Sequence, residues 1–153
     1  MKQLLRLIGV AAIAFALGVS VARMPLAHAA AAPLQAGAVD LLAISPDAMP
    51  SPSTTFPNLR SKTLVATDGM TAALQMGTAN KHYHADANEI QIVLAGSGTE
   101  WLGTNQVPLA PGMMIVIPAG TNHAGLVDTS GGKLRFVSIK TPPQAPTDVH
   151  FVQ

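Results

Sequence analysis

The sequence predicts an all-β domain of the sandwich or barrel type, and three observations favour it. The 153 residues include 13 glycines and 12 prolines, which suit many short strands joined by turns. After Leu59, short apolar runs are separated by turn residues at roughly 8- to 12-residue intervals, a spacing typical of such domains. No segment after the first 29 residues has a helical period. Because the length leaves room for one domain, we predict a single β domain.

Residues 1–29 have the pattern of a secretory signal peptide. Lys2 and Arg6 precede an uncharged apolar run over residues 7–22, and Ala-His-Ala at 27–29 offers a cleavage site. This run is shorter than the roughly 20 residues that a membrane-spanning helix needs, and an uncleaved N-terminal membrane anchor is the alternative interpretation. We expect a periplasmic or secreted protein with no stable membrane partner once the signal peptide is removed.

Composition excludes several classes of protein. The chain has no cysteine, which rules out disulfide scaffolds, zinc ribbons and cysteine nucleophiles. Its formal charge of +1 comes from the leader, because removing residues 1–29 takes away three of the nine basic residues and none of the eight acidic ones. The mature chain therefore carries about −2, with its basic residues scattered, and we predict no nucleic-acid partner.

Residues 30–58 are expected to form a Pro-rich N-terminal arm that packs on the domain or is partly disordered. Turn-forming residues dominate this stretch, which disfavours regular structure. The prolines that interrupt it are Pro33, Pro46, Pro50, Pro52 and Pro57.

The domain is predicted to span residues 59–141, and a C-terminal tail at residues 142–153 begins with Pro142. The expected strands are residues 61–67, 70–76, 89–94, 99–102, 106–109, 113–117, 123–127 and 133–139. The runs at 90–94 and 113–117 are apolar on both alternating faces. Since a strand with only one face on the core alternates cleanly, we expect the outer faces of these two strands to be covered, for example by a second subunit.

Four residues between positions 82 and 123 could bind a metal. His82 and His84 are two apart, so on a strand they share a face. Glu89 opens the next strand, and His123 follows a Pro-Ala-Gly turn. Imidazole suits Zn, Cu, Fe and Ni, and a carboxylate extends the choice to Mn. Asp86 is a rival carboxylate, but it lies in the spacer and we favour Glu89.

Two spaced motifs contain these ligands. The first has His-x-His, four residues, Glu, six residues and Gly; the second has Gly, five residues, Pro-x-Gly, two residues and His. Their residues are Gly77, His82, Tyr83, His84, Glu89 and Gly96, then Gly112, Pro118, Gly120 and His123. This pattern resembles the two cupin motifs, with two departures. Gly77 is one residue closer to His82 than is usual, and Val127 stands where the family usually has Asn.

The resemblance implies a double-stranded β-helix, the cupin jelly-roll barrel, with a divalent transition metal (Cu, Zn, Mn, Fe or Ni) inside. It also implies a protein that often forms a homodimer. If the metal is held by His82, His84, Glu89 and His123, positions remain open for Lewis-acid or O₂ chemistry.

We therefore expect a metal-dependent oxygenase-type enzyme, or a lyase or isomerase, acting on a small molecule. The candidate catalytic residues are Glu89 and Gln91, because Gln91 shares the face of Glu89 and its amide needs a partner there. The alternative is a non-catalytic cupin that binds a metal or a small ligand, which the scarcity of polar pocket residues favours. The further pocket candidates are Met76, Trp101, Met113, Met114, Asn122 and Phe136.

Overall fold

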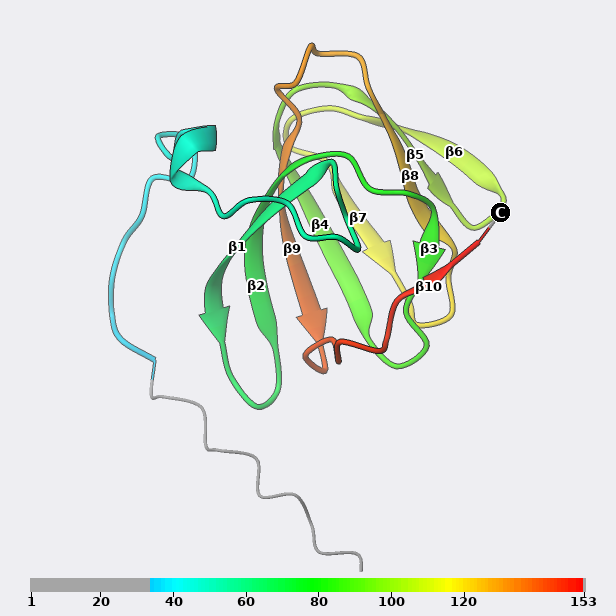
Figure 1. Ribbon diagram of the computed structural model, residues 1–153, viewed down its shortest axis with the longest axis horizontal. Coiled ribbons are helices and arrows are strands. Elements are labelled where there is room, and N and C mark those ends of the chain that lie inside the picture. Colours follow the sequence, from blue (N-terminus) through cyan, green and yellow to red (C-terminus); the bar gives the residue numbers. More distant parts are fainter. Residues whose placement is uncertain (1–33, 153) are drawn as a thin grey trace, which may run out of the picture.

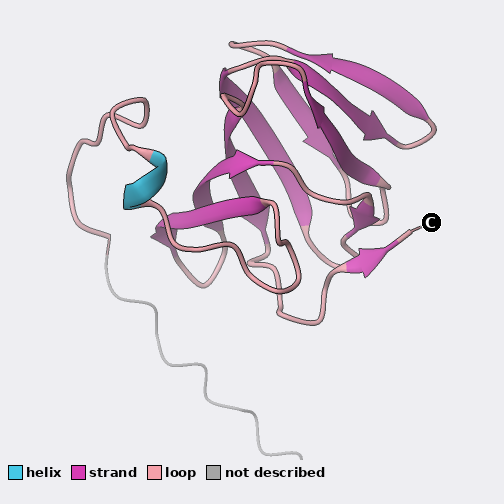
Figure 2. Ribbon diagram, turned by 45° about the horizontal axis from the view of Figure 1, so that its top comes forward, coloured by secondary structure: helices cyan, strands magenta, loops and turns pink. Residues whose placement is uncertain are grey.

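A computed structural model describes residues 34–152, and the expected signal peptide at residues 1–29 lies outside them. Two antiparallel sheets of five strands each face one another (Figure 1). The helical element with defined bounds in this part of the chain is one 3-10 turn, Pro46–Ala48, which lies beside the strands (Figure 2). The prediction of an all-β domain is confirmed.

The order of strands across each sheet defines the barrel. The first sheet runs β1 (Leu59–Ala66), β2 (Thr71–Gly77), β9 (Arg135–Thr141), β4 (Asn88–Ala95), β7 (Met114–Ile117). The second sheet runs β10 (His150–Phe151), β3 (His82–Tyr83), β8 (His123–Asp128), β5 (Gly98–Leu102), β6 (Asn105–Leu109). From β3 to β4, from β4 to β5, and from β6 through β9, the chain repeatedly crosses between the sheets. This winding is the predicted jelly roll.

Apolar side chains fill most of the space between the sheets. They alternate with outward-facing residues along each strand, as the burial of Gln91, Val93, Ile115 and Ile117 shows for the neighbouring strands β4 and β7. The main cluster includes Val93, Leu109, Ile115, Ile117, Leu126, Leu134 and Phe136. The polar side chains described below lie at the end of the barrel where β3, β4 and β8 meet.

The N-terminal arm packs on the outer face of the first sheet. Leu74 and Met76 of β2 point away from the barrel interior, and Met49 of the arm covers them in a separate apolar cluster. The Arg135 guanidinium donates hydrogen bonds to the main-chain oxygens of Leu42 (2.9 Å) and Ile44 (3.0 Å). The arm is therefore part of the hydrophobic packing of this sheet.

The C-terminal segment is built into the second sheet. We expected residues 142–153 to be a tail, but β10 pairs with β3, with His150 opposite Tyr83. The two rings stack with their centroids 4.8 Å apart. The expectation failed because the prolines from Pro142 onward redirect the chain around the barrel instead of ending the fold. No helix within residues 34–152 has the length and hydropathy needed to cross a membrane.

Candidate metal centre

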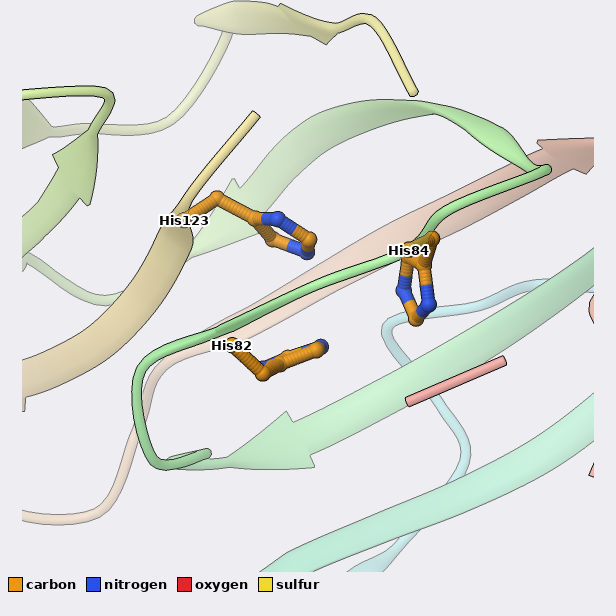
Figure 3. A group of neighbouring side chains, drawn as sticks. All are labelled: His82, His84 and His123. Carbon is orange, nitrogen blue, oxygen red and sulfur yellow. The ribbon is translucent and has the colours of Figure 1, made fainter. Parts of the chain in front are cut away.

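Three histidines converge inside the barrel at the junction of β3 and β8. His82 begins β3, His84 follows that strand directly, and His123 begins β8 as the cross-strand partner of His82. All three are almost completely buried, and one ring nitrogen from each lies within 4.8 Å of the others. Figure 3 shows the imidazoles turned toward one another. This group could hold a metal ion.

The hydrogen bonds of the three rings fix which nitrogen faces the centre. Nδ1 of His82 donates to the main-chain oxygen of Asn80 at 2.7 Å. In the same way, Nδ1 of His84 donates to Asp148 and Nδ1 of His123 to Thr121 (2.9 Å). A carbonyl oxygen only accepts, so each Nδ1 carries the hydrogen and each neutral ring keeps its lone pair on Nε2. Backbone bonds of this kind orient histidine ligands in metal sites.

Glu89 brings a carboxylate to the same point. Its Oε2 lies 3.3 Å from Nε2 of His84 and 3.3 Å from Nε2 of His123. Its Oε1 accepts hydrogen bonds from the Ser138 hydroxyl (2.7 Å) and the Gln91 amide (3.2 Å). One carboxylate oxygen is therefore held by the protein, while the other faces the two rings.

The ring nitrogens that face the centre are hydrogen-bond acceptors when the rings are neutral, and the Glu89 carboxylate opposite them is an acceptor too. Nε2 of His84 and Nε2 of His123 are buried and receive no hydrogen bond. With their hydrogens on Nδ1, they present lone pairs to the Glu89 carboxylate. A buried arrangement of unpaired acceptors is costly, and a cation at their centre would satisfy all of them. The donor set of three imidazoles and one carboxylate thus fits a divalent transition metal.

Burial and mutual charge keep the ligands in the protonation states that a metal requires. Burial lowers the pKa of His82 to about 4, and the nearby His123 adds to this effect. Burial acts to raise the pKa of Glu89, but hydrogen bonds that the imidazoles of His123 and His84 donate whenever they carry a second proton, together with the Lys140 ammonium, hold it well below its usual value. At neutral pH His82 is therefore uncharged and Glu89 is ionised.

The structure separates the two candidate carboxylates. Glu89 is buried among the histidines, whereas the Asp86 side chain is exposed in the turn between His84 and β4. Gln91, on the same face as Glu89, donates its amide hydrogen to that carboxylate. Glu89 is therefore the carboxylate placed to act with the histidines.

Most of the other pocket candidates lie elsewhere. Phe136 lines the narrow space at the histidines. Met76 instead faces the arm, Met114 is exposed, and the Trp101 ring packs under the Lys81 ammonium at 4.1 Å. Alternation along a strand fixes which residues share a face, but it does not say which face lines the pocket when another segment buries the outer face. The expectation for Met76, Met114 and Trp101 was therefore wrong.

Asp148 is a buried residue that the sequence interpretation missed. Its carboxylate accepts hydrogen bonds from the main-chain N–H groups of Ala85 (2.6 Å), Asp86 (3.2 Å) and Ala87 (3.0 Å). Burial acts to raise the pKa of Asp148, and these hydrogen bonds outweigh that effect and lower it. Asp148 thereby fixes the turn that joins His84 to Glu89. Asp148 lies in the predicted C-terminal tail, where no neighbouring residue indicates a role at the histidines.

Glu100 is a second buried acid that was not predicted. It lies on β5, opposite a bulge in β8, and is completely buried with no hydrogen-bond partner for either oxygen. Burial raises its pKa to about 7, with a smaller opposing effect from His123. Near neutral pH this carboxyl is therefore only about half ionised.

Comparison with known proteins identifies similar domains. Residues 70–140 match the family described as the cupin domain. The fold is similar to KdgF from Halomonas sp. (21% identity, covering 59% of this chain and 84% of that one, TM-score 0.53). A Bacillus halodurans protein of known structure is also similar (26% identity, 59% and 76% coverage, TM-score 0.51). So is Pac13 of Streptomyces, a nucleoside dehydratase (15% identity, 63% and 79% coverage, TM-score 0.54). No curated protein matches the sequence.

Proposed function

This chain is a member of the cupin superfamily, and from that premise we propose that it is an exported metalloprotein acting on a small molecule. Three imidazole nitrogens, from His82, His84 and His123, and the Glu89 carboxylate would hold one divalent transition metal. The three histidines alone could bind the ion, and the carboxylate would complete the set.

One observation carries this proposal. Nε2 of His84 and Nε2 of His123 are buried lone pairs, each 3.3 Å from the Glu89 carboxylate, with no hydrogen-bond donor at either nitrogen. Histidines that serve only as packing residues satisfy both ring nitrogens or leave one in solvent. Here every Nδ1 donates a hydrogen bond to a main-chain oxygen, which leaves the Nε2 atoms available to bind a metal.

A bound metal would supply open coordination positions for Lewis-acid or O₂ chemistry. The protein contributes the orientation of Glu89 through Ser138 and Gln91, and Gln91 is proposed as a positioning residue of the catalytic site. Among the described residues that line the narrow pocket, Lys140 is the one titratable side chain besides the proposed ligands. Oxygenase-type chemistry is the first choice because it needs no dedicated protein base, whereas a lyase or isomerase would depend on Lys140.

The second candidate is a non-catalytic cupin that holds a metal or a small ligand. The small number of titratable side chains at the pocket favours this non-catalytic function. The two candidates differ in turnover. Protein loaded with Mn, Fe(II), Cu or Zn would be tested for O₂ uptake with a panel of phenols and diketones. Turnover with one metal supports the enzyme, and tight binding without turnover supports the binder.

Export bears on which metal is bound. A chain that folds outside the cytoplasm acquires its ion there, where the order of affinities favours Cu and Zn. We expect Cu or Zn in protein purified from its native compartment, and Fe or Ni after cytoplasmic expression of the leaderless form. Elemental analysis of both preparations tests this, and the same ion in both would contradict it.

Metal content of single variants tests the site itself. His82→Ala, His84→Ala and His123→Ala should each abolish stoichiometric binding, and Glu89→Gln should weaken it. His150→Ala removes a partly exposed imidazole outside the cluster, 3.8 Å from the Asp148 carboxylate, and should retain stoichiometric binding. Full metal content in two of the three cluster variants, measured by elemental analysis after chelation and reloading, would overturn the proposal.

A further inference from the structure

A larger cavity of about 340 Å³ adjoins the metal pocket on the inner face of β1, β2 and β9. The arm contributes Ser51, Ser53 and Phe56 to its wall, and Gln144 borders it. The residues that line both spaces are Phe56, Leu59, Gln75 and Lys140. A molecule in the cavity would therefore lie next to the proposed metal.

The wall of this cavity is polar where a barrel interior is ordinarily apolar. On β2 the apolar Leu74 and Met76 point outward under the arm, while Thr71 and Gln75 point inward. The hydroxyl side chains that line the cavity are Ser51, Ser53, Ser61, Thr63, Thr71 and Ser138. Of these groups Ser138 is buried, Thr71 and Gln75 are partly buried, and the other hydroxyl side chains are exposed. Hydroxyl and amide groups both donate and accept hydrogen bonds, so this wall suits a ligand rich in oxygen atoms.

Lys140 makes the cavity positively charged. It is the single charged residue among the described residues that line the cavity. Its side chain is 13% exposed, and Nζ lies 3.6 Å from the Glu89 Oε2 and donates a hydrogen bond to the Gln144 amide oxygen. Glu89 is thus the carboxylate that balances this ammonium when no metal is bound.

Metal binding would change that balance. If Glu89 is a ligand, its one negative charge faces both a divalent cation and the Lys140 ammonium. The buried region then has an excess of positive charge, which is unfavourable unless an anion compensates it. The place where an anion can reach both cations is the space beside Lys140, which is shared by the cavity and the metal pocket.

Resting on the metal function proposed above, we infer that the cavity binds a small hydroxy- or oxo-carboxylic acid. Its carboxylate pairs with Lys140, its further oxygens bond to the hydroxyl wall, and one of them faces the metal. The volume lies near the lower end of the range of about 300–1,000 Å³ typical of ligand pockets, which indicates a small molecule rather than a polymer.

Calorimetric titration with matched ligands tests this inference. The probes are malate, gluconate and 2-oxoglutarate, with malamide and glucitol as uncharged counterparts of the first two and inorganic phosphate as a non-carboxylate anion. Zn-loaded protein should bind at least one carboxylate about tenfold or more tightly than its uncharged counterpart, because a charge-assisted hydrogen bond is lost in the counterpart. Binding of phosphate alone, or equal binding of charged and uncharged ligands, would overturn the inference.

Three lysine variants locate the contact. Lys140→Met should weaken carboxylate binding about tenfold or more while leaving uncharged ligands unaffected, and Lys140→Arg should keep most of the affinity. Lys133→Met is the control for net charge, since Lys133 is exposed and outside the cavity. Unchanged carboxylate affinity in Lys140→Met would overturn the inference.

Metal content measured on the same samples separates the two proposals. If zinc binds stoichiometrically and the carboxylates do not, the anion site is wrong and the metal function stands. If zinc does not bind, the metal function is wrong, and the anion site, which depends on the charge of both the metal and Lys140, is wrong with it.

Discussion

The main-chain oxygen of Asp148 accepts the Nδ1 hydrogen of His84, although 64 residues separate them in the chain. The same residue, through its carboxylate, fixes the turn that leads to Glu89. One C-terminal residue therefore orients a proposed ligand and the approach to another. The closing segment of the barrel is part of the candidate metal centre as well as of the fold.

We expect Asp148→Ala to reduce metal affinity about 10- to 100-fold, the usual cost of losing a group that supports metal ligands. It leaves three main-chain N–H groups without their partner, so the metal-free protein should also lose about 1–3 kcal/mol of stability. Competition with a chelator and urea unfolding measure the two effects. Asp86→Ala, which removes an exposed carboxylate next to the turn, is the control, and equal metal affinities in the two variants would contradict the prediction.

A second positioning effect is expected at Gly120. Its φ of +79° is disfavoured for residues with a side chain, and its N–H donates to the His84 main-chain oxygen at 2.7 Å. Gly120→Val should therefore displace the turn before His123 and weaken metal binding without removing a ligand. Gly69→Val is the matched control, because its backbone is not in the left-handed region and a side chain there meets no atom. Near-normal affinity in folded Gly120→Val would count against this role.

The sequence was sufficient for the parts of the centre that depend on local spacing. His82 and His84 share a face because they are two apart on a strand, and the Pro-Gly turn returns His123 to the interior. Lys140 and Asp148 reach the centre through pairing between distant strands. The residues next to Lys140 and Asp148 in the sequence do not indicate which distant strands will pair, so these two contacts could not be predicted.

The position of the N-terminal arm explains the error about which side chains of β2 face inward. β2 carries Leu74 and Met76 outward, where the arm covers them, and Thr71 and Gln75 inward, where the cavity lies. The usual rule that the apolar face points to the core therefore assigns Met76 to the wrong side. Only the position of the arm reveals that this sheet has two buried faces.

The arm should contribute measurably to stability. Met49 is almost completely buried against Leu74 and Met76. Met49→Ala should lower the free energy of unfolding by about 2–3 kcal/mol, within the usual range for emptying such a site. Leu34→Ala is the control, since Leu34 is exposed and its loss should cost less than about 0.5 kcal/mol. Urea unfolding of both variants checks this, and equal stabilities would show that the arm does not hold the sheet.

Glu100 should make stability depend on pH. Its pKa is about 7 in the folded protein and 4.5 for an unperturbed glutamate, as in the unfolded chain, so the folded state binds more protons between these values. The contribution of Glu100 to stability is therefore greatest below about pH 4.5 and falls as pH rises through 7, by about 3 kcal/mol in all. Glu100→Gln cannot ionise and should be more stable than the natural chain by about this amount at pH 8.

Comparison of the two chains at two pH values isolates this effect. Most of the difference between Glu100→Gln and the natural chain should disappear at pH 5, because the folded carboxyl is then protonated. Metal-free protein is used so that metal binding does not add its own pH dependence. A difference in the free energy of unfolding that stays constant from pH 5 to pH 8 would show that Glu100 does not carry the penalty.

We propose that the outer face of β4 and β7 is the contact surface of the homodimer that the cupin resemblance implies. Val116 is exposed and pairs across the strands with Ile90, so apolar side chains lie together at the sheet edge. Val116→Lys places a charge on this face and should shift the protein from dimer to monomer in sedimentation velocity. Val127→Lys is the matched control, because Val127 is similarly exposed but lies on the other sheet, and it should leave the dimer intact. A natural chain that is monomeric at micromolar concentration, or a dimer that Val116→Lys leaves unchanged, would exclude this surface as the interface.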